Sequence, residues 1–340
     1  MRLTTREIAY LMPSFTERTS IGLFSNIKAK PDGTEYQSLM KKGVIQGNGY
    51  APGTLEILLH IASPQRCGRV IVKNDCCVIE KYTYWKNGKK ILAENINGEF
   101  AFSNIYDSSD IIIGLSDFFS MSNIKTADVS LILPPDEMIV LLAVIDIYRK
   151  NTLLNYAGKT NESEFIILQE ITNELTSGFE NGLVKIFVNN YDFKIPSAVN
   201  TESLLTNLIR KGALEFKKGY RLTNELTLLA NSFLIPQAIV LFEAFDAAAD
   251  GNLSVDGGLC VAAGIHDILS FAVGENEVKL FTLSAFQMLS AVENVLECPS
   301  VFQDTEQNAP APVPDNSVWQ CQCGTTNAGN FCSSCGMKRQ

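Results

Sequence analysis

Four of the nine cysteines in this 340-residue chain fall within its last twenty residues, at Cys321, Cys323, Cys332 and Cys335. Zn²⁺ prefers four soft or borderline ligands in a tetrahedron, and thiolates are such ligands. Cys332 and Cys335 have the two-residue spacing of a zinc knuckle. Cys321 and Cys323 form a closer pair, which is followed at once by Gly324. This pattern predicts one bound Zn²⁺.

So short a segment cannot build a hydrophobic core, so the metal must supply most of its folding free energy. The alternative is a pair of disulfides in a secreted tail. The opening residues, Met1 to Glu7, lack the basic-then-apolar order of a signal peptide, which favours zinc over disulfides. All four thiolates are used, so no open coordination position remains and we expect a structural metal.

The segment from Trp319 to Gly336 resembles the short bacterial zinc ribbons that are appended to many unrelated proteins. It is also similar to Ran-binding-protein-type zinc fingers, which share the leading Trp319 and the central Asn327. Those fingers bind ubiquitin or RNA, but their first cysteine pair and the loop between the pairs are longer. Their ligand preference is therefore not carried over to this chain.

The two histidines are the other candidates for chemistry. His60 lies in an apolar segment and His266 precedes Asp267, and we expect a structural or surface role for each. Adjacent Cys76 and Cys77 could form a redox or metal site, but we expect one to face the core and one the solvent along a strand. No nucleophile elbow, dinucleotide fingerprint or metalloprotease helix is present, so no reaction can be named.

Composition restricts the class of protein further. Apolar residues make up 46% of the chain, enough for a substantial core, and the formal net charge is −9. An acidic chain repels phosphate backbones, which argues against a general nucleic-acid binder. The longest strongly apolar run, Met138–Ile145, is too short to span a bilayer. We therefore expect a cytoplasmic protein without membrane insertion.

The body of the chain contains an internal repeat. Leu3 is followed by two cap residues, Glu7 and an apolar run, and Leu133 is followed in the same way by Glu137 and an apolar run. Thr4 and Glu7 have the spacing of a capping box, in which each side chain satisfies an unpaired backbone N–H. The Pro134-Pro135 pair predicts a second helix start, with acidic residues at the positive end of the helix dipole.

A second pair of matching segments follows in the same order. Lys42-Gly43 is followed by Tyr50 and another apolar segment, and Lys211-Gly212 by Tyr220 and another apolar segment. Each reads as a helix that ends at a glycine able to adopt the left-handed conformation, then a short extended piece, then a helix. This is the local pattern of a winged-helix-like unit.

Each half then turns to strands and ends in a helix. Predicted strands are Arg69–Lys73, Val78–Trp85, Lys90–Asn95 and Glu99–Asn104 in the first half, and Ala238–Phe245, Gly258–Gly264, Ile268–Val273 and Val278–Thr282 in the second. Lys86-Asn87-Gly88 predicts a hairpin turn. The closing helices are predicted at Ser109–Phe119 and Ser284–Leu296, the second capped by Ser284.

These patterns predict an α+β protein with two pseudo-symmetric halves, each winged-helix-like with an antiparallel sheet, plus a C-terminal zinc ribbon. The first half spans residues 1–130 and the second 131–298, with an insertion near 151–196 that carries a helix at Glu162–Thr176. Residues 299–317 are Pro-rich and predict a flexible linker, and residues 318–340 hold the ribbon.

From Arg2 to Glu297, the opening helix with its glutamate, the Lys-Gly turn with its tyrosine and the strand meander resemble the EspG-type chaperones of type VII (ESX) secretion. That family has a pseudo-two-fold mixed fold that binds helical secretion substrates in the cytosol. The resemblance implies a non-enzymatic chaperone or adaptor, whose partner is another protein and a small helical one. The zinc tail is an addition to the family's pattern.

Three functions remain open, and each predicts a different surface. A protein-binding chaperone or adaptor requires an exposed apolar groove or sheet face. A winged-helix regulator of nucleic acid would use Lys41-Lys42 and Arg210-Lys211 in a basic stripe across both halves. An enzyme of unrecognised type would place His60 or His266 in a pocket beside a carboxylate.

Overall fold

The computed structural model describes residues 1–74, 76–104, 109–159, 165–178, 182–247, 253–263 and 268–297, and near the C-terminus 319–320, 322 and 326–327. The chain divides into two compact units, Met1–Pro299 and Ser300–Gln340. The first unit is built of helices and an antiparallel sheet, which confirms the predicted α+β class.

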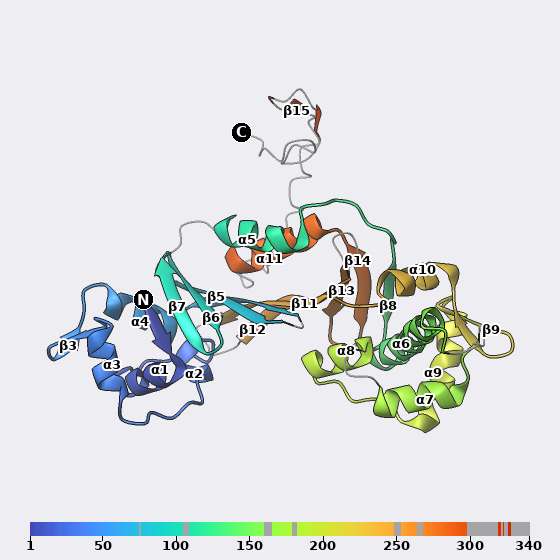
Figure 1. The fold of residues 1–340 in the computed structure, drawn as a ribbon, viewed down its shortest axis with the longest axis horizontal. Helices are drawn as coiled ribbons and strands as arrows, with labels where there is room; N and C mark the ends of the chain where they lie inside the picture. Colours follow the sequence, from blue (N-terminus) through green and yellow to red (C-terminus); the bar gives the residue numbers. More distant parts are fainter. Residues whose placement is uncertain are drawn as a thin grey trace. The chain divides into compact units, whose positions relative to one another are not determined.

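A ten-stranded sheet forms the centre of the first unit (Figure 1). All its neighbouring strands pair antiparallel. Its strands, from one edge to the other, are β1 (Arg2–Thr4), β7 (Glu99–Asn104), β6 (Lys89–Ile96), β5 (Val78–Lys86), β4 (Arg66–Lys73), β11 (Ala238–Ala247), β12 (Leu253–Ala262), β13 (Ile268–Val273), β14 (Val278–Leu283) and β8 (Ser130–Leu133).

The order of this sheet reads alike from both edges. At each edge, a short strand that comes before the helices of its half pairs with the last strand of that half's meander. These pairs are β1 with β7 and β8 with β14. The halves meet where β4 pairs with β11, with Arg69 opposite Glu243 and Ile71 opposite Leu241. The two halves, each a four-stranded meander plus one edge strand, therefore form one continuous sheet.

Helices of the first half precede the meander and pack on it. They are α1 (Thr5–Leu11), the 3₁₀ turn η1 (Met12–Ser14), α2 (Leu23–Asn26), α3 (Glu35–Lys41) and α4 (Thr54–Ala62), with the small ribbon β2 (Ile45–Gln46) and β3 (Gly49–Tyr50) between α3 and α4. Thr4 and Glu7 form the expected capping box at the start of α1. The helix begins where the sequence predicts because its first free N–H groups are satisfied there.

The second half repeats this arrangement with additional helices. They are α6 (Pro135–Tyr156), α7 (Leu168–Ser177), α8 (Leu183–Tyr191), α9 (Ala198–Arg210) and α10 (Asn224–Ser232), with the ribbon β9 (Leu214–Phe216) and β10 (Tyr220–Leu222) between α9 and α10. The apolar run Met138–Ile145 lies in α6, and all its residues are completely buried. The run is therefore the core helix of this half. None of the helices in the described part of the chain is long and apolar enough to cross a membrane.

Matching glycines end α3 and α9. Gly43 and Gly212 adopt positive φ values of 70° and 73°. In both places the amide of the residue after the glycine donates a hydrogen bond to a carbonyl oxygen in the last turn of the helix. Val44 N donates to Leu39 O at 2.9 Å, and Ala213 N donates to Leu208 O at 3.0 Å. Only glycine adopts this conformation without strain from a side chain, so the predicted helix ends are confirmed.

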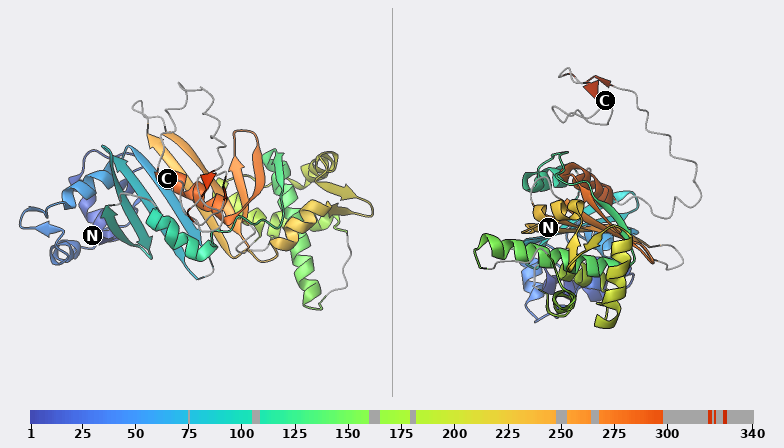
Figure 2. Two further views of the ribbon diagram at one scale, coloured as in Figure 1. Left: turned by 90° about the horizontal axis from the view of Figure 1, so that it is seen from above. Right: turned by 90° about the vertical axis from the view of Figure 1, so that its right-hand side faces the viewer.

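Two further helices, α5 (Ser109–Phe119) and α11 (Ala285–Glu297), lie against one face of the sheet, as Figures 1 and 2 show. Ser284 caps α11, with its Oγ accepting from the Gln287 amide at 3.2 Å. Val70, Val72 and Val240 point into this layer. Because side chains alternate along a strand, the residues between them point to the opposite face, where the helices of the two halves pack.

The insertion in the second half differs from the prediction. Its first described helix, α7, begins at Leu168 and not at Glu162, and residues 160–164 lie outside the described part. A second helix, α8, follows and was not predicted. Strand β12 begins at Leu253, five positions before the predicted start at Gly258. Gly257 and Gly258 lie within this strand, where a close approach to Phe242 calls for glycine.

Candidate functional site: a groove beside the central strands

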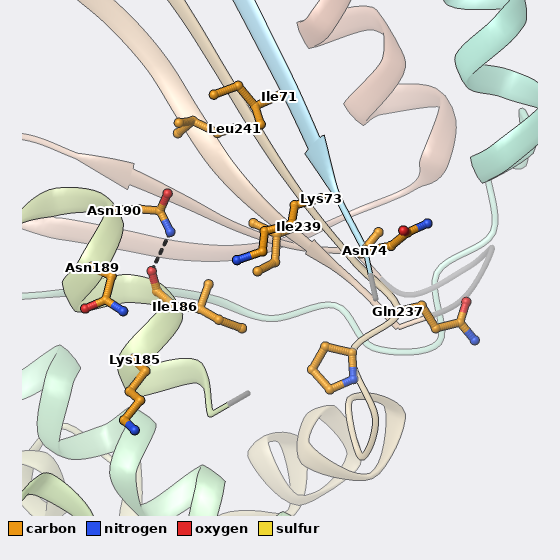
Figure 3. Close-up of a pocket in the computed structure, with 12 residues that line it drawn as sticks. Ile71, Lys73, Asn74, Lys185, Ile186, Asn189, Asn190, Gln237, Ile239 and Leu241 are labelled. Carbon is orange, nitrogen blue, oxygen red and sulfur yellow. Dashed lines mark hydrogen bonds between the residues drawn. The ribbon is translucent and has the colours of Figure 1, made fainter. Parts of the chain in front are cut away.

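A cavity of about 310 Å³ opens on the sheet face opposite α5 and α11 (Figure 3). It lies where β4 and β11 meet and where helix α8 passes beside them. Its lining residues are Ile71, Lys73, Asn74, Lys185, Ile186, Asn189, Asn190, Pro236, Gln237, Ala238, Ile239 and Leu241. We call this cavity the central groove.

The floor of the central groove comes from alternate residues of two paired strands. Ile71 lies opposite Leu241, and Lys73 lies opposite Ile239. Their neighbours Val70 and Val72 are buried under α5 and α11, so these four side chains must point to the groove side. Ile71, Ile239 and Leu241 are only partly buried, which leaves an apolar surface open to solvent.

Helix α8 supplies the wall. Lys185, Ile186, Asn189 and Asn190 recur at helical spacing and face the groove. Asn190 Nδ2 donates to the Ile186 carbonyl oxygen at 2.7 Å, the contact drawn in Figure 3. On the inner side of the same helix, the ring of Phe187 lies 5.1 Å from that of Phe271 in the core. The wall is thus anchored in the second half's core.

A buried carboxylate holds the start of α8. The two oxygens of Asp146, on α6, accept hydrogen bonds from the Leu183 and Val184 amides, each at 3.0 Å. Arg149 pairs with the same carboxylate and donates to the Leu234 carbonyl oxygen at 3.3 Å. Burial raises the pKa of Asp146 to about 6, against the opposing effect of Arg149 and the two amides. The position of the groove wall therefore depends on a titratable side chain.

The groove continues past α8 toward α7. A second cavity of about 480 Å³ shares Lys73, Lys185 and Asn189 with the first. It adds apolar side chains of both helices and of the chain after α8, among them Leu175 and Ile195. The two cavities therefore form neighbouring parts of one surface, with the two lysines at their junction.

Across the sheet, an ion pair bounds the apolar floor. Arg69 pairs with Glu243, its direct neighbour across β4 and β11. Burial would lower the pKa of Arg69, but the Glu243 carboxylate outweighs it and raises that pKa. The guanidinium also lies over the Phe245 ring, 5.7 Å from its centre. On β4 and β11, the Arg69–Glu243 ion pair thus lies next to the apolar residues of the groove floor.

His60 has a structural setting, as predicted. It is 6% exposed, and its Nδ1 and Nε2 lie 2.8 Å and 3.2 Å from the carbonyl oxygens of Glu56 and Lys86. These contacts connect α4 to the end of β5, and the residues that line the central groove do not include His60. His266 lies outside the described residues, so its role stays a prediction.

The lysines that a nucleic-acid regulator would need are engaged elsewhere. Lys42 pairs with Glu7 at 2.8 Å, and Lys211 pairs with Glu137 at 2.7 Å. Arg210 donates to the Asn207 side chain. Each of the two lysines is therefore neutralised by a glutamate of its own half, which weakens the basic stripe that the regulator hypothesis requires.

The expectation for Cys76 and Cys77 was wrong. Both are exposed and free, and they lie in the turn between β4 and β5, outside either strand. The Asn74 side chain accepts hydrogen bonds from both of their amides, at 2.9 Å and 2.8 Å. This turn breaks the alternation of a strand, so neither thiol is directed into the core. Cys67 and Cys260, in contrast, are buried.

The proposed zinc ligands Cys321, Cys323, Cys332 and Cys335 lie outside the described residues. The described part of this unit contains a short hairpin of β15 (Trp319–Gln320) and β16 (Thr326–Asn327). Within the described chain, no cluster of three or more His, Cys, Asp or Glu side chains is arranged to hold a metal ion.

The groove itself was not located by sequence reasoning. Its wall helix α8 falls in a segment predicted only as an insertion. Leu183, Val184, Ile186 and Phe187 follow the apolar spacing of an amphipathic helix, and this signal could have located it. Pairing of β4 with β11, which makes the floor, has no local signal in the sequence.

No protein-family model and no curated protein matches this chain. Among solved structures, the chain is similar to that of the Mycobacterium tuberculosis type VII secretion system chaperone EspG5 in complex with a PE25–PPE41 dimer. The match has a TM-score of 0.49 and 8% sequence identity, and it covers 88% of this chain and 97% of the other.

Proposed function

We propose that this protein is a non-enzymatic chaperone or adaptor that binds a helical segment of another protein, in the cytoplasm, through the central groove. The observation that carries the proposal is the groove itself: an open apolar floor on two central strands beside a firmly anchored helix. The resemblance of residues 2–297 to EspG-type chaperones suggests helical secretion substrates as the class of partner.

The geometry of the floor favours a helix over an extended peptide. β4 and β11 are both paired on each side, so a partner cannot add a strand to them. The two true edges, β1 and β8, are only 3 and 4 residues long and give little template for strand addition. A partner must therefore present side chains to the floor, as an amphipathic helix does in a groove.

The lining also favours binding over catalysis. Its polar groups are the amides of Asn74, Asn189, Asn190 and Gln237 and two lysines. Neither a histidine nor a carboxylate accompanies them among the described lining residues. Amides and ammonium groups orient a bound surface by hydrogen bonding, whereas general acid–base catalysis needs a group that exchanges protons near neutral pH.

Substitution of the floor tests the proposal. Full-length protein is purified from its native cells with associated proteins, and the associated protein is then produced separately for affinity measurement. Ile239→Asp and Leu241→Asp place a charge on the apolar floor, so we expect affinity to fall at least about 100-fold, as for loss of an interface anchor. Val199→Asp, at an 89% exposed position of α9, is the matched control and should bind normally.

Circular dichroism and thermal unfolding must show that the floor variants fold. Equal affinity of folded Ile239→Asp and wild-type protein would reject the groove as the binding surface. If nucleic acid is recovered in place of a protein partner, and Ile239→Asp does not affect it, the regulator hypothesis replaces this proposal.

We also propose that residues 318–340 form a zinc ribbon, tethered by a linker at 299–317, in which Cys321, Cys323, Cys332 and Cys335 hold one structural Zn²⁺. The antiparallel pairing of β15 with β16 supports it, because Cys321 and Cys323 lie between these two strands in the sequence. Four thiolates match the preferred donor set of a closed zinc site.

Metal analysis tests this second proposal. Elemental analysis of the purified full-length protein should give one zinc per chain, and Cys332→Ser/Cys335→Ser should lose it. Cys76→Ser/Cys77→Ser removes the same number of thiols from the body and should retain the zinc. Zinc that persists in Cys332→Ser/Cys335→Ser would contradict the assignment of these ligands.

A further inference from the structure

The central groove has a charge that differs in sign from that of the whole chain. The chain carries a formal net charge of −9, yet the only charged side chains among the described residues lining the first cavity are Lys73 and Lys185. Neither of these lysines belongs to an ion pair within the described residues. The lining thus has two ammonium groups without a carboxylate partner.

These lysines come from opposite sides of the groove. Lys73 is at the end of β4, on the floor, and Lys185 is in the first turn of α8, on the wall. Both also line the second cavity, together with Asn189. A group bound where the cavities meet would therefore be within reach of a cation from each side and of an amide from α8.

Among the described residues that line the second cavity, Glu174 is the one acidic residue, and it does not reverse the sign of this charge. Glu174 is 7% exposed and lies near the buried guanidinium of Arg149, whose charge it helps to stabilise. Arg149 is already paired with Asp146, so the charge of Glu174 counts in full, and two lysines against one glutamate still give the described lining of the second cavity a formal charge of +1. The described lining of the groove therefore presents a net positive surface to a partner.

We propose that the helical partner carries a carboxylate beside its apolar contact residues and that this carboxylate sits between Lys73 and Lys185. This inference rests on the proposed function of the groove. The apolar residues of the helix cover Ile71, Ile239 and Leu241, and the carboxylate fixes the register of the helix along the groove. Because the rest of the chain is acidic, a carboxylate is attracted at this place and repelled elsewhere.

Charge complementarity of this kind selects partners more than it adds affinity. A basic helix of the same apolar pattern would leave its charges against two lysines in a partly desolvated site, which is unfavourable. The groove should therefore discriminate between helices that have the same apolar face but different flanking charges.

Three matched helical peptides test this inference on the full-length protein. Each has about 18 residues, enough for several turns, and the same leucines on one face. The positions flanking the leucines are all Glu, all Gln or all Lys. Fluorescence anisotropy measures their affinities at about 0.05 M and about 0.5 M NaCl, because salt screens exposed charges.

We expect the Glu peptide to bind at least about tenfold more tightly than the Lys peptide at low salt, and the ratio to shrink at high salt. Lys73→Gln/Lys185→Gln should remove the preference, so that the Glu and Lys peptides bind with equal affinity. Lys217→Gln/Lys218→Gln, which removes the same charge from an exposed turn, should keep the preference.

Two outcomes separate this inference from the function on which it rests. If all three peptides bind equally and Ile239→Asp abolishes their binding, the groove binds helices but the carboxylate inference is overturned. If wild-type protein binds none of the peptides, the helix-binding function is overturned and the inference with it. A Glu preference that survives Lys73→Gln/Lys185→Gln overturns the assignment of these lysines.

Discussion

Nζ of Lys42 donates to Oε2 of Glu7 across 2.8 Å, and this contact joins the end of α3 to the first turn of α1. The second half repeats it, with Lys211 Nζ donating to Glu137 Oε2 at 2.7 Å. In both halves the glutamate is at least 95% buried and the lysine immediately precedes the glycine that ends its helix. The same ion pair thus connects the corresponding two helices in each half.

Loss of either lysine should destabilise the protein. Lys42→Met or Lys211→Met leaves a buried carboxylate without its cation, and we expect the free energy of unfolding to fall by about 1–3 kcal/mol. Urea denaturation measures the change. Lys41→Met removes the same charge from an exposed neighbour and should change stability by less than about 0.5 kcal/mol. Equal effects at positions 41 and 42 would contradict the structural role of the pair.

The effect of Lys42→Met should also depend on pH. Burial acts to raise the pKa of Glu7, but hydrogen bonds from Lys42 and Ser38 outweigh it, so the net pKa is below its ordinary 4.5. A carboxyl with a lowered pKa stabilises the folded protein above pH 4.5 and loses that contribution as pH falls through the folded pKa. The difference between wild type and Lys42→Met should therefore be largest near neutrality and shrink in acid.

Asp146 should show the opposite dependence. Its pKa is raised from 3.8 to about 6, first by burial, so the folded protein holds this proton more tightly than the unfolded chain. Its contribution to the free energy of unfolding therefore falls as pH rises between those values. In Asp146→Asn nothing titrates at this position, so wild-type stability should decrease relative to the variant across that window. A constant difference in urea denaturation would refute this.

At neutral pH, Asp146→Asn should still destabilise the protein. The side-chain oxygen of the new asparagine can accept a hydrogen bond from the backbone amide of Leu183 or Val184, but asparagine has no charge to pair with Arg149. We therefore expect the free energy of unfolding to fall by about 2–4 kcal/mol. Because α8 forms the groove wall, the folded variant should also bind the groove's partner more weakly. Asp192→Asn, at an exposed helix end, is the matched control and should change neither property.

Substitution of glycine by alanine should have opposite effects on stability at two positions, Gly257 and Gly114. A Cβ at Gly257 would lie 2.2 Å from the Phe242 carbonyl oxygen, so Gly257→Ala must disturb the pairing of β11 with β12 and should destabilise by more than about 2 kcal/mol. A Cβ at Gly114, within α5, meets nothing within 4 Å. Gly114→Ala should therefore stabilise by about 0.5–1 kcal/mol. Thermal unfolding of both variants checks these signs.

Thiol reactivity should separate the exposed cysteines of the body from the buried ones. Cys76 and Cys77 are exposed, whereas Cys260 is buried and its pKa is raised to about 12, so its reactive thiolate is scarce. Titration with a chromogenic disulfide reagent should show two fewer fast-reacting thiols in Cys76→Ser/Cys77→Ser than in native full-length protein. An unchanged count would show that this turn is not exposed in solution.

Local features of the body could be predicted because their causes lie within a few residues. The capping box of Thr4 and Glu7 and the turn glycines Gly43 and Gly212 follow from backbone groups that the neighbouring sequence must satisfy. The repeat also indicated that Glu7 and Glu137 are equivalent. It did not indicate that each glutamate meets the lysine before its glycine, because those contacts span 35 and 74 residues.

The amino-acid sequence by itself determined the α+β composition, the repeated order of elements and the cysteine pattern of the tail. Tertiary structure alone decided that β4 pairs with β11, that α8 lies beside them and that Lys73 and Lys185 line the same groove. Strand pairing and helix packing depend on surfaces brought together from distant parts of the chain, for which a local pattern of residues contains no information.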